Sequence, residues 1–156
     1  MTAIETCYIS TGCNRTPHCA DWGCSGLICF GACRSVSIYQ PEDENKSAKI
    51  LKTYVHHKER VNCVAWIKKY PVSDGDNVGL ISGSVDTTAV VWRYTEGKLQ
   101  PIATLKNHTG PVNGVSAICL PTCQNQSVAM TTYVATSSAD STVNIWKQEN
   151  DVDFQL

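Results

Sequence analysis

Two parts of this sequence repeat one another at a constant spacing, and this internal repeat restricts the possible folds more than any other feature. Residues 80–92, LISGSVDTTAVVW, match residues 134–146, VATSSADSTVNIW, so that Asp86 corresponds to Asp140 and Trp92 to Trp146. Upstream of each, HHKERVNCVAW (56–66) matches NHTGPVNGVSAI (107–118), and GLICFGACRSVSIY (26–39) is a more divergent third copy. Such a chain builds one structural unit per repeat, and each unit buries its apolar face against the next.

Within each copy, apolar and polar residues alternate with a period of two, as in strands with one buried face. Val143 and Ile145 flank Asn144, for example, and Gly, Ser, Asp and Asn bound the short apolar runs. No window of eleven or more residues has the apolar stripe of a helix. The pattern predicts strands near 26–30, 35–39, 49–55, 61–67, 78–82, 88–93, 100–105, 112–119, 132–136 and 142–147, with 4–10 as a weaker candidate.

Four short strands per repeat are the composition of a propeller blade, so we expect an all-β chain of about three four-stranded blades. The expected blades are about 17–55, about 56–106 and about 107–156, the last with a truncated outer strand. KKYPVSDGDN (68–77) and LPTCQNQSVAMT (120–131) contain turn residues, so we predict two loops that emerge on the same face.

Each of the two clear copies carries a histidine, a hydroxyl residue, an aspartate and a tryptophan at equivalent positions. This combination is typical of a WD40 blade, in which the four side chains form a buried hydrogen-bonded chain. The expected members are His57, Ser82, Asp86 and Trp92 in the second blade, and His108, Thr136, Asp140 and Trp146 in the third. A serine, a histidine and an aspartate are also the parts of a hydrolase triad. Because the set occurs twice, each time with a tryptophan that a triad does not need, we predict structural networks and no catalytic residues.

The first blade departs from this pattern. Cys33 occupies the aspartate position, Cys13 the histidine position, and Trp22 the position of Trp66. We therefore expect this blade to lack the network and to depend on apolar packing.

Composition excludes several classes of function. The net charge of −1 predicts no preference for nucleic acid or anionic membranes, and no apolar run is long enough to span a bilayer. Nine cysteines occur, but none forms a Cys-x-x-Cys pair, so reduced, buried thiols are favoured over a zinc site. We expect no cofactor, no metal and no small-molecule substrate, and a location in the cytoplasm and nucleus because the N-terminus has no secretory signal.

Basic residues gather in one stretch of the sequence. Seven of the 13 lysines and arginines lie there: Lys46, Lys49, Lys52, Lys58, Arg60, Lys68 and Lys69. One interpretation is a contact for an acidic partner strand or RNA phosphates. The other, which we favour, is a solvated outer strand with two loops, because lysines commonly protect strand edges.

The segment CNRTPHCADWGCSGLICFGACRSVSIYQP (13–41) resembles the opening of the Elongator complex protein 2 family, and HHKERVNCVAWI, HTGPV and SSADSTVNIW are similar to that family's next two blades. The resemblance implies a non-catalytic scaffold that binds the large scaffold subunit and the catalytic radical and acetyltransferase subunit of Elongator. It also implies an indirect role in modifying the wobble uridine of transfer RNA.

Two other interpretations stay open: a generic WD40 adaptor in another assembly, and a zinc- or cysteine-dependent enzyme. Three blades cannot close around an axis, so we expect a partial propeller with open edges. We interpret the chain as a fragment, truncated product or short isoform that is marginal or aggregates when alone.

Overall fold

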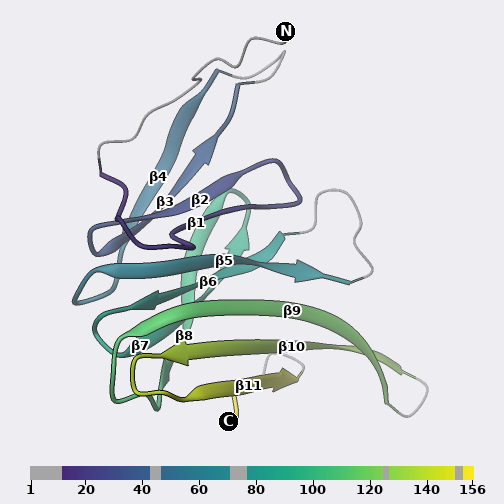
Figure 1. The fold of residues 1–156 in the computed structure, drawn as a ribbon. Helices are drawn as coiled ribbons and strands as arrows, with labels where there is room; N and C mark the ends of the chain where they lie inside the picture. The colour runs from purple at the N-terminus through teal and green to yellow at the C-terminus, as the bar shows by residue number, and fades with distance from the viewer. Residues whose placement is uncertain (1–11, 43–46, 71–76, 125–126, 150–152) are drawn as a thin grey trace, which may run out of the picture.

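The fold is described from a computed structural model for residues 12–42, 47–70, 77–124, 127–149 and 153–156 (Figure 1). The strand candidate at 4–10 lies outside these ranges. Eleven strands form within them: β1 (Ala20–Trp22), β2 (Ile28–Ala32), β3 (Ser35–Gln40), β4 (Lys49–Val55), β5 (Val61–Lys69), β6 (Asn77–Ser84), β7 (Thr88–Thr95), β8 (Lys98–Lys106), β9 (Val112–Gln124), β10 (Ser127–Ser138) and β11 (Val143–Glu149). No helix in the described part of the chain is long and apolar enough to cross a membrane.

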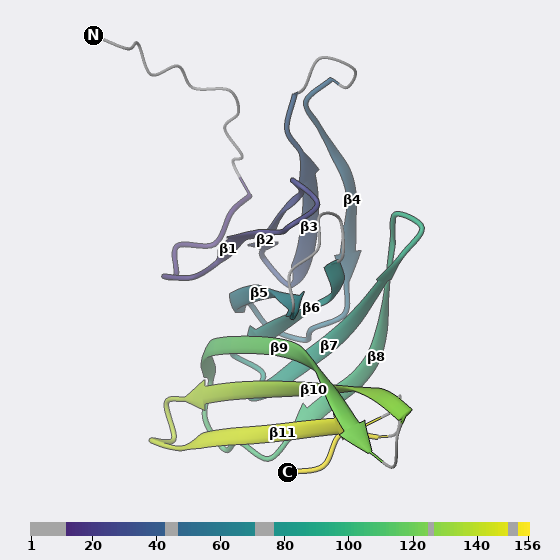
Figure 2. The same cartoon turned by 90° about the vertical axis from the view of Figure 1, so that its right-hand side faces the viewer.

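The strands form three antiparallel groups that follow one another along the chain, and we call them blades 1, 2 and 3. Blade 1 is the sheet β1-β2-β3-β4, and blade 2 has the order β5-β6-β7-β8. Blade 3 contains β9, β10 and β11, and Gln155 pairs with Lys147 beside β11. Blades 1 and 3 lie at opposite ends with blade 2 between them (Figures 1 and 2). The expected partial, all-β propeller is confirmed.

The innermost strands of blades 2 and 3 run parallel and meet at one end. Lys68 pairs with Ile118 and Lys69 with Cys119, which joins the two blades into one seven-stranded sheet. The amide of Tyr70 then donates to the carbonyl of Cys119 at 2.8 Å. Since β5 and β9 point in the same direction, the chain leaves both strands at the same end of the molecule.

Two predictions about local structure were wrong. The sequence pattern indicated no strand at Ala20–Trp22, where β1 pairs with β2. The predicted loop at 120–131 is mostly a hairpin, because β9 continues to Gln124 and β10 begins at Ser127. Main-chain pairing continues through its polar residues, and the hydroxyls of Thr122 and Thr131 meet across the strands at 2.8 Å.

Apolar side chains are buried in two clusters, one in each joint between blades. Trp66, Leu80 and Trp92 are paired in one row on a face of blade 2. This row packs against a cluster of blade 1 side chains that contains Cys29, Val36 and Ile38. We call this face of a blade, which lies toward the preceding blade, its back face.

The opposite side of each blade is its forward face. In blade 2 it carries Ile81, Ala89 and Val91, which pack against Val134 and Trp146 on the back face of blade 3. Each joint therefore brings the forward face of one blade against the back face of the next.

Candidate functional site

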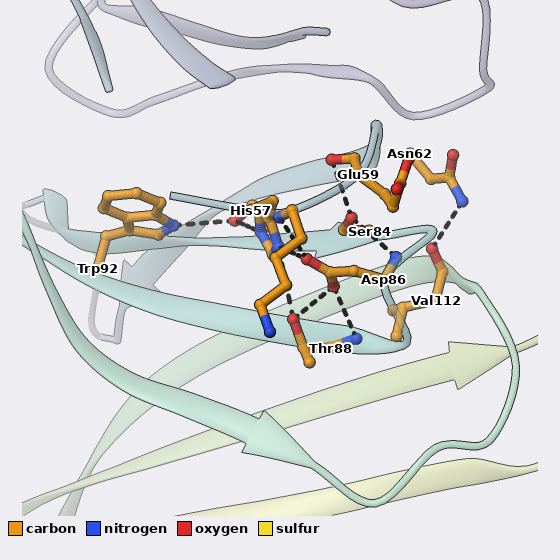
Figure 3. Close-up of polar contacts among 10 residues, drawn as sticks. His57, Glu59, Asn62, Ser84, Asp86, Thr88, Trp92 and Val112 are labelled. Carbon is orange, nitrogen blue, oxygen red and sulfur yellow. Dashed lines mark hydrogen bonds and ion pairs between the residues drawn. The ribbon is translucent and has the colours of Figure 1, made fainter. Parts of the chain in front are cut away.

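Two buried hydrogen-bond networks contain the eight residues singled out by the repeat. In blade 2, His57 lies just after β4, Ser82 on β6, Asp86 in the turn before β7, and Trp92 on β7. The Trp92 indole nitrogen lies 2.9 Å from Ser82 Oγ, and His57 Nε2 lies 2.8 Å from the same oxygen (Figure 3). His57 Nδ1 lies 3.1 Å from Asp86 Oδ2. The four side chains thus form one continuous chain.

The chemistry of the groups determines where the protons lie. The ionised Asp86 carboxylate can only accept, so His57 Nδ1–H donates to it. A neutral imidazole carries one proton, so Nε2 accepts from the Ser82 hydroxyl, whose oxygen in turn accepts from the Trp92 indole N–H. Burial lowers the pKa of His57, which holds the imidazole neutral, although the nearby carboxylate opposes this shift.

Asp86 organises the turn around it. Burial by itself would raise the pKa of Asp86, but hydrogen bonds from the Thr88 hydroxyl, the Lys58 amide and the Thr88 amide lower it to about 2. The corresponding distances to the carboxylate oxygens are 2.6, 2.9 and 3.0 Å. Asp86 is therefore an anion that fixes both the turn between β6 and β7 and the chain that enters β5.

Blade 3 repeats this geometry with a threonine in place of the serine. Trp146 donates to Thr136 Oγ1 at 3.1 Å, and that oxygen lies 2.9 Å from His108 Nε2. His108 Nδ1 lies 3.1 Å from Asp140 Oδ2. One difference is Asn144, whose amide nitrogen lies 3.3 Å from His108 Nε2 and replaces Val90 of blade 2 at the equivalent position.

The order of groups in blade 2 matches a serine–histidine–aspartate triad, so the possibility of catalysis depends on access. Ser82 is 0% exposed, and its oxygen already accepts from Trp92. A nucleophile must reach a substrate carbonyl, and this hydroxyl faces packed side chains on β6 and β7. The arrangement instead stabilises the fold, because it pairs buried hydrogen-bond donors and acceptors. Each of these groups would lower the stability of the folded state by about 1–3 kcal/mol if it had no partner.

Blade 1 uses a different residue, which the sequence pattern did not identify. Asn14 Oδ1 accepts from the Cys33 amide at 3.0 Å, and its Nδ2 donates to the Cys33 carbonyl at 2.9 Å. The same Nδ2 reaches the carbonyl of Val61 at 2.8 Å. Asn14 therefore holds the β2–β3 turn and also ties blade 1 to blade 2. Its position beside Cys13, the mapped histidine position, was the available clue.

Two further polar residues join neighbouring blades. Asp21 Oδ2 accepts from the Trp66 amide at 2.8 Å, which links β1 to β5. Asn62 is buried, and its Nδ2 donates to the Val112 carbonyl at 3.1 Å and to Asn113 Oδ1 at 3.0 Å. The repeated Val-Asn pairs at 61–62 and 112–113 were visible in the sequence, but their role in the joint was not.

The cysteines are in part buried and in part exposed. Cys29, Cys63 and Cys119 are buried in strands, as expected, whereas Cys13 and Cys33 are exposed. Burial raises the pKa of Cys29 out of its ordinary range and that of Cys63 to about 12. Among the described residues, no group of three or more His, Cys, Asp or Glu side chains is placed to hold a metal ion.

The basic stretch is divided among three parts of the fold. Lys49 and Lys52 are on the outer strand β4, Lys58 and Arg60 lie in the turn before β5, and Lys68 and Lys69 end β5. Lys46 lies outside the described residues. Lys52 lies over the ring of Tyr54 at 5.4 Å, and Arg60 Nε donates to Asn62 Oδ1 at 3.3 Å.

An open hollow of about 460 Å³ lies along the innermost strands. Asp21 of β1, Lys68 of β5 and Ser116 of β9 line it, together with Ser137 and Val143 of blade 3. Its lining includes the acidic Asp21 and the basic Lys68, and Ser137 and Val143 belong to the forward face of blade 3.

Comparison with known proteins agrees with this architecture. The model of the "WD domain, G-beta repeat" family matches residues 48–93 and 99–147. The chain is 36% identical over 148 residues to Elongator complex protein 2 of Danio rerio, covering 95% of this chain and 16% of the relative. It is 38% identical over 154 residues to Elongator complex protein 2 of Drosophila melanogaster, covering 97% and 18%.

A more distant relative is Protein transport protein SEC13 of Debaryomyces hansenii, which is 28% identical over 130 residues and is matched over 77% of this chain and 40% of its own length. The chain spans less than a fifth of the Elongator relatives named above. The expected resemblance to Elongator complex protein 2 is confirmed. With the family model matched over both networks, the chain belongs to the WD40 repeat family.

Proposed function

We propose that this chain is a non-catalytic WD40 scaffold of the Elongator complex, and that it supports the modification of transfer RNA wobble uridines through protein–protein interactions. The observation that carries the proposal is the similarity to Elongator complex protein 2 along 95–97% of the chain. The geometry agrees with a scaffold, because the His57 and Asp86 side chains use their hydrogen-bonding groups on the fold itself.

The proposed partners are the large scaffold subunit and the catalytic radical and acetyltransferase subunit of Elongator, in the cytoplasm and nucleus. Transfer RNA would be served indirectly, through those subunits. Because loops and blade rims carry most of the function in such scaffolds, contacts are expected there.

Affinity purification followed by mass spectrometry tests the proposal. A tagged copy of the chain should recover the large Elongator subunit from cells that express the complex. The matched control is the tagged Trp66→Ala variant, which removes a buried indole from the joint between blades 1 and 2 and should lose the partner with the fold. Failure of the intact chain to recover any Elongator subunit would overturn the proposal.

A second candidate function is that of an adaptor in another assembly, and the observation that favours it is the similarity to Protein transport protein SEC13. The same purification separates the two candidates, since an adaptor of this kind would recover a stable set of proteins without Elongator subunits.

For the basic residues, we infer a solvated outer strand at Lys49 and Lys52, which are both exposed on β4. The alternative is a contact there with an acidic partner strand, and in that case the double variant Lys49→Glu, Lys52→Glu should reduce recovery of the partner. Lys98→Glu, on the outer strand β8 of blade 2, is the control for charge reversal elsewhere. If the parent chain, the double variant and the Lys98→Glu control recover the partner equally, only the interpretation of a solvated outer strand remains.

A further inference from the structure

Four basic side chains from three separate segments come together at the end of blades 1 and 2 where the chain enters their innermost strands. They are Arg15, Arg34, Lys58 and Arg60, and we call them the basic corner. All four are exposed, and among the described residues none of them forms an ion pair. The corner belongs to the turns at the end of the blades, not to a face on which one blade packs against another.

Hydrogen bonds around Asn14 hold three of these segments together. Asn14 Nδ2 donates to the carbonyls of Cys33 and Val61, at 2.9 and 2.8 Å. The Val61 amide also donates to the Cys33 carbonyl, at 2.8 Å. The residues next to these three in sequence are Arg15, Arg34 and Arg60. An arginine side chain is longer than the roughly 3.8 Å between successive Cα atoms, so all three can reach one ligand that lies over this group.

The acidic groups at this end of the blades do not neutralise the corner. The Asp86 carboxylate holds its own turn, because it accepts from the hydroxyl and amide of Thr88 and from the Lys58 amide. Glu59 is exposed and adds one negative charge to the four positive ones. Like charges that lie close together repel one another, so the corner lowers the stability of the fold until an anion binds there.

The chemistry of the corner favours a phosphate group as that anion. Three of its four members are arginines, whose forked N–H groups bind carboxylate and phosphate oxygens in pairs. One arginine satisfies a carboxylate, whereas a phosphate monoester carries nearly two negative charges and has three oxygens that accept from several arginines. Arg60 Nε donates to Asn62 Oδ1 at 3.3 Å, and its terminal nitrogens have no partner among the described residues.

The source of the phosphate is a protein and not a nucleic acid. No Trp, Tyr or Phe stands next to any member of the corner in the sequence, and bound single strands stack their bases on such rings. The net charge of −1 also gives RNA no general attraction to this chain. Clusters of arginines are a recurring way to recognise phosphorylated segments of proteins.

We propose that the basic corner binds a phosphoserine or phosphothreonine in an extended segment of a partner protein. Phosphorylation adds the charge that the corner lacks, so the partner docks after it is modified and leaves when the phosphate is removed. The site goes beyond the scaffold role proposed above, because its chemistry is the same whichever assembly contains the chain.

Fluorescence anisotropy with the purified 156-residue chain tests the proposal. The probe is a labelled glycine–alanine peptide with one phosphoserine, and two comparison peptides carry serine or glutamate at that position. The chain should bind the phosphopeptide at least about tenfold more tightly than either comparison peptide, because each loses charge-assisted hydrogen bonds. A labelled oligouridine of the same length should also bind more weakly than the phosphopeptide.

Variants locate the binding at the corner. Arg34→Gln with Arg60→Gln should weaken binding of the phosphopeptide about tenfold or more. Arg34→Lys with Arg60→Lys keeps the charge but not the fork, and should retain part of the affinity. The matched control, Lys49→Gln with Lys98→Gln, removes two charges from exposed positions on β4 and β8 and should bind as the parent does. Because all the substituted side chains are exposed, the variants should keep the circular dichroism of the parent.

Several results would overturn the proposal: equal binding of the three peptides, no binding of the phosphopeptide, tighter binding of oligouridine, or an equal loss in the control variant. The outcome is separate from that of the affinity purification. A chain that binds the phosphopeptide but recovers no Elongator subunit would contradict the proposed function and leave the basic corner supported.

Discussion

At the level of single residues, the networks show that a hydroxyl, more than a particular amino acid, joins tryptophan to histidine. Ser82 and Thr136 occupy equivalent positions in the two repeats, and each oxygen receives an indole N–H and faces a histidine Nε2. The indole contact measures 2.9 Å in blade 2 and 3.1 Å in blade 3, so the exchange of serine for threonine leaves the geometry nearly unchanged. The hydroxyl is therefore the group to remove in a test.

Ser82→Ala should destabilise the protein by about 2–4 kcal/mol, because it leaves the Trp92 indole N–H and His57 Nε2 buried without partners. Urea denaturation at pH 7, followed by circular dichroism, measures the change. Ser82→Thr is the control: it retains the hydroxyl, as blade 3 does at Thr136, and should cost less than about 1.5 kcal/mol. Equal losses for the two variants would contradict the assigned role of the hydroxyl.

At the level of strands, two glycines allow one blade to approach the next. A Cβ at Gly83 of β6 would lie 2.6 Å from Val112 Cγ1 and 2.7 Å from Cys63 Sγ. A Cβ at Gly31 of β2 would lie 2.6 Å from Cys19 Sγ and 3.0 Å from Val61 Cγ1. Each glycine thus faces the first valine of the following blade, so the inner strands can pack without a gap.

Gly83→Ala should therefore destabilise the joint between blades 2 and 3, by about 1–3 kcal/mol for overpacking in a buried site. The matched control is Gly12→Ala, whose added Cβ would meet Ala32 Cβ at an ordinary 3.8 Å. Urea midpoints of the two variants provide the comparison. If the urea midpoint of Gly83→Ala is no lower than that of Gly12→Ala, the strands around Gly83 accommodate the added Cβ without loss of stability, which would contradict the prediction.

At the level of the whole molecule, the two networks make stability depend on pH. Folding lowers the pKa of His57 through burial and the pKa of Asp86 to about 2. The pKa of Asp140 is also held below its usual range, first by the hydrogen bond from the Thr142 hydroxyl. In each case the unfolded chain binds protons more readily than the folded one, so stability falls as pH falls.

The free energy of unfolding should thus be greatest near neutral pH and decrease in two stages. The first begins below pH 6.5, the ordinary histidine value, as His57 takes up a proton in the unfolded chain. The second runs from the ordinary aspartate value of 3.8 down to about 2, as Asp86 does the same. Urea midpoints measured between pH 7 and pH 2 follow both stages.

Asp86→Asn serves as the control for the second stage, because it removes the titrating group. This variant should be less stable at pH 7 and should lose less stability than the parent between pH 4 and pH 2. A parent protein whose urea midpoint is constant from pH 7 to pH 3 would contradict the depressed pKa values.

The sequence by itself determined the class of fold and the members of both networks. The positions of Ser82, Asp86 and Trp92 recur 54 residues later and that of His57 recurs 51 residues later, and these two shifts identified the four residues as one unit, because a repeat must place equivalent residues in equivalent positions. The alternation of apolar and polar residues with a period of two located most strands, since successive side chains of a strand point to opposite faces and only one face is buried. It missed β1, which has only three residues and therefore almost no pattern, and it ended β9 too early and began β10 too late.

Only the tertiary structure decided how the blades meet. Asn14, Asp21 and Asn62 act on main-chain groups of the neighbouring blade, 47, 45 and 50 residues away in sequence. A contact between a side chain and a distant main-chain carbonyl or amide imposes no residue type on its partner, so it leaves no pattern in a single sequence. The same holds for the exposed side chains of Trp22 and Ile145, because apolar residues at strand positions look alike in a sequence whether they are buried or exposed.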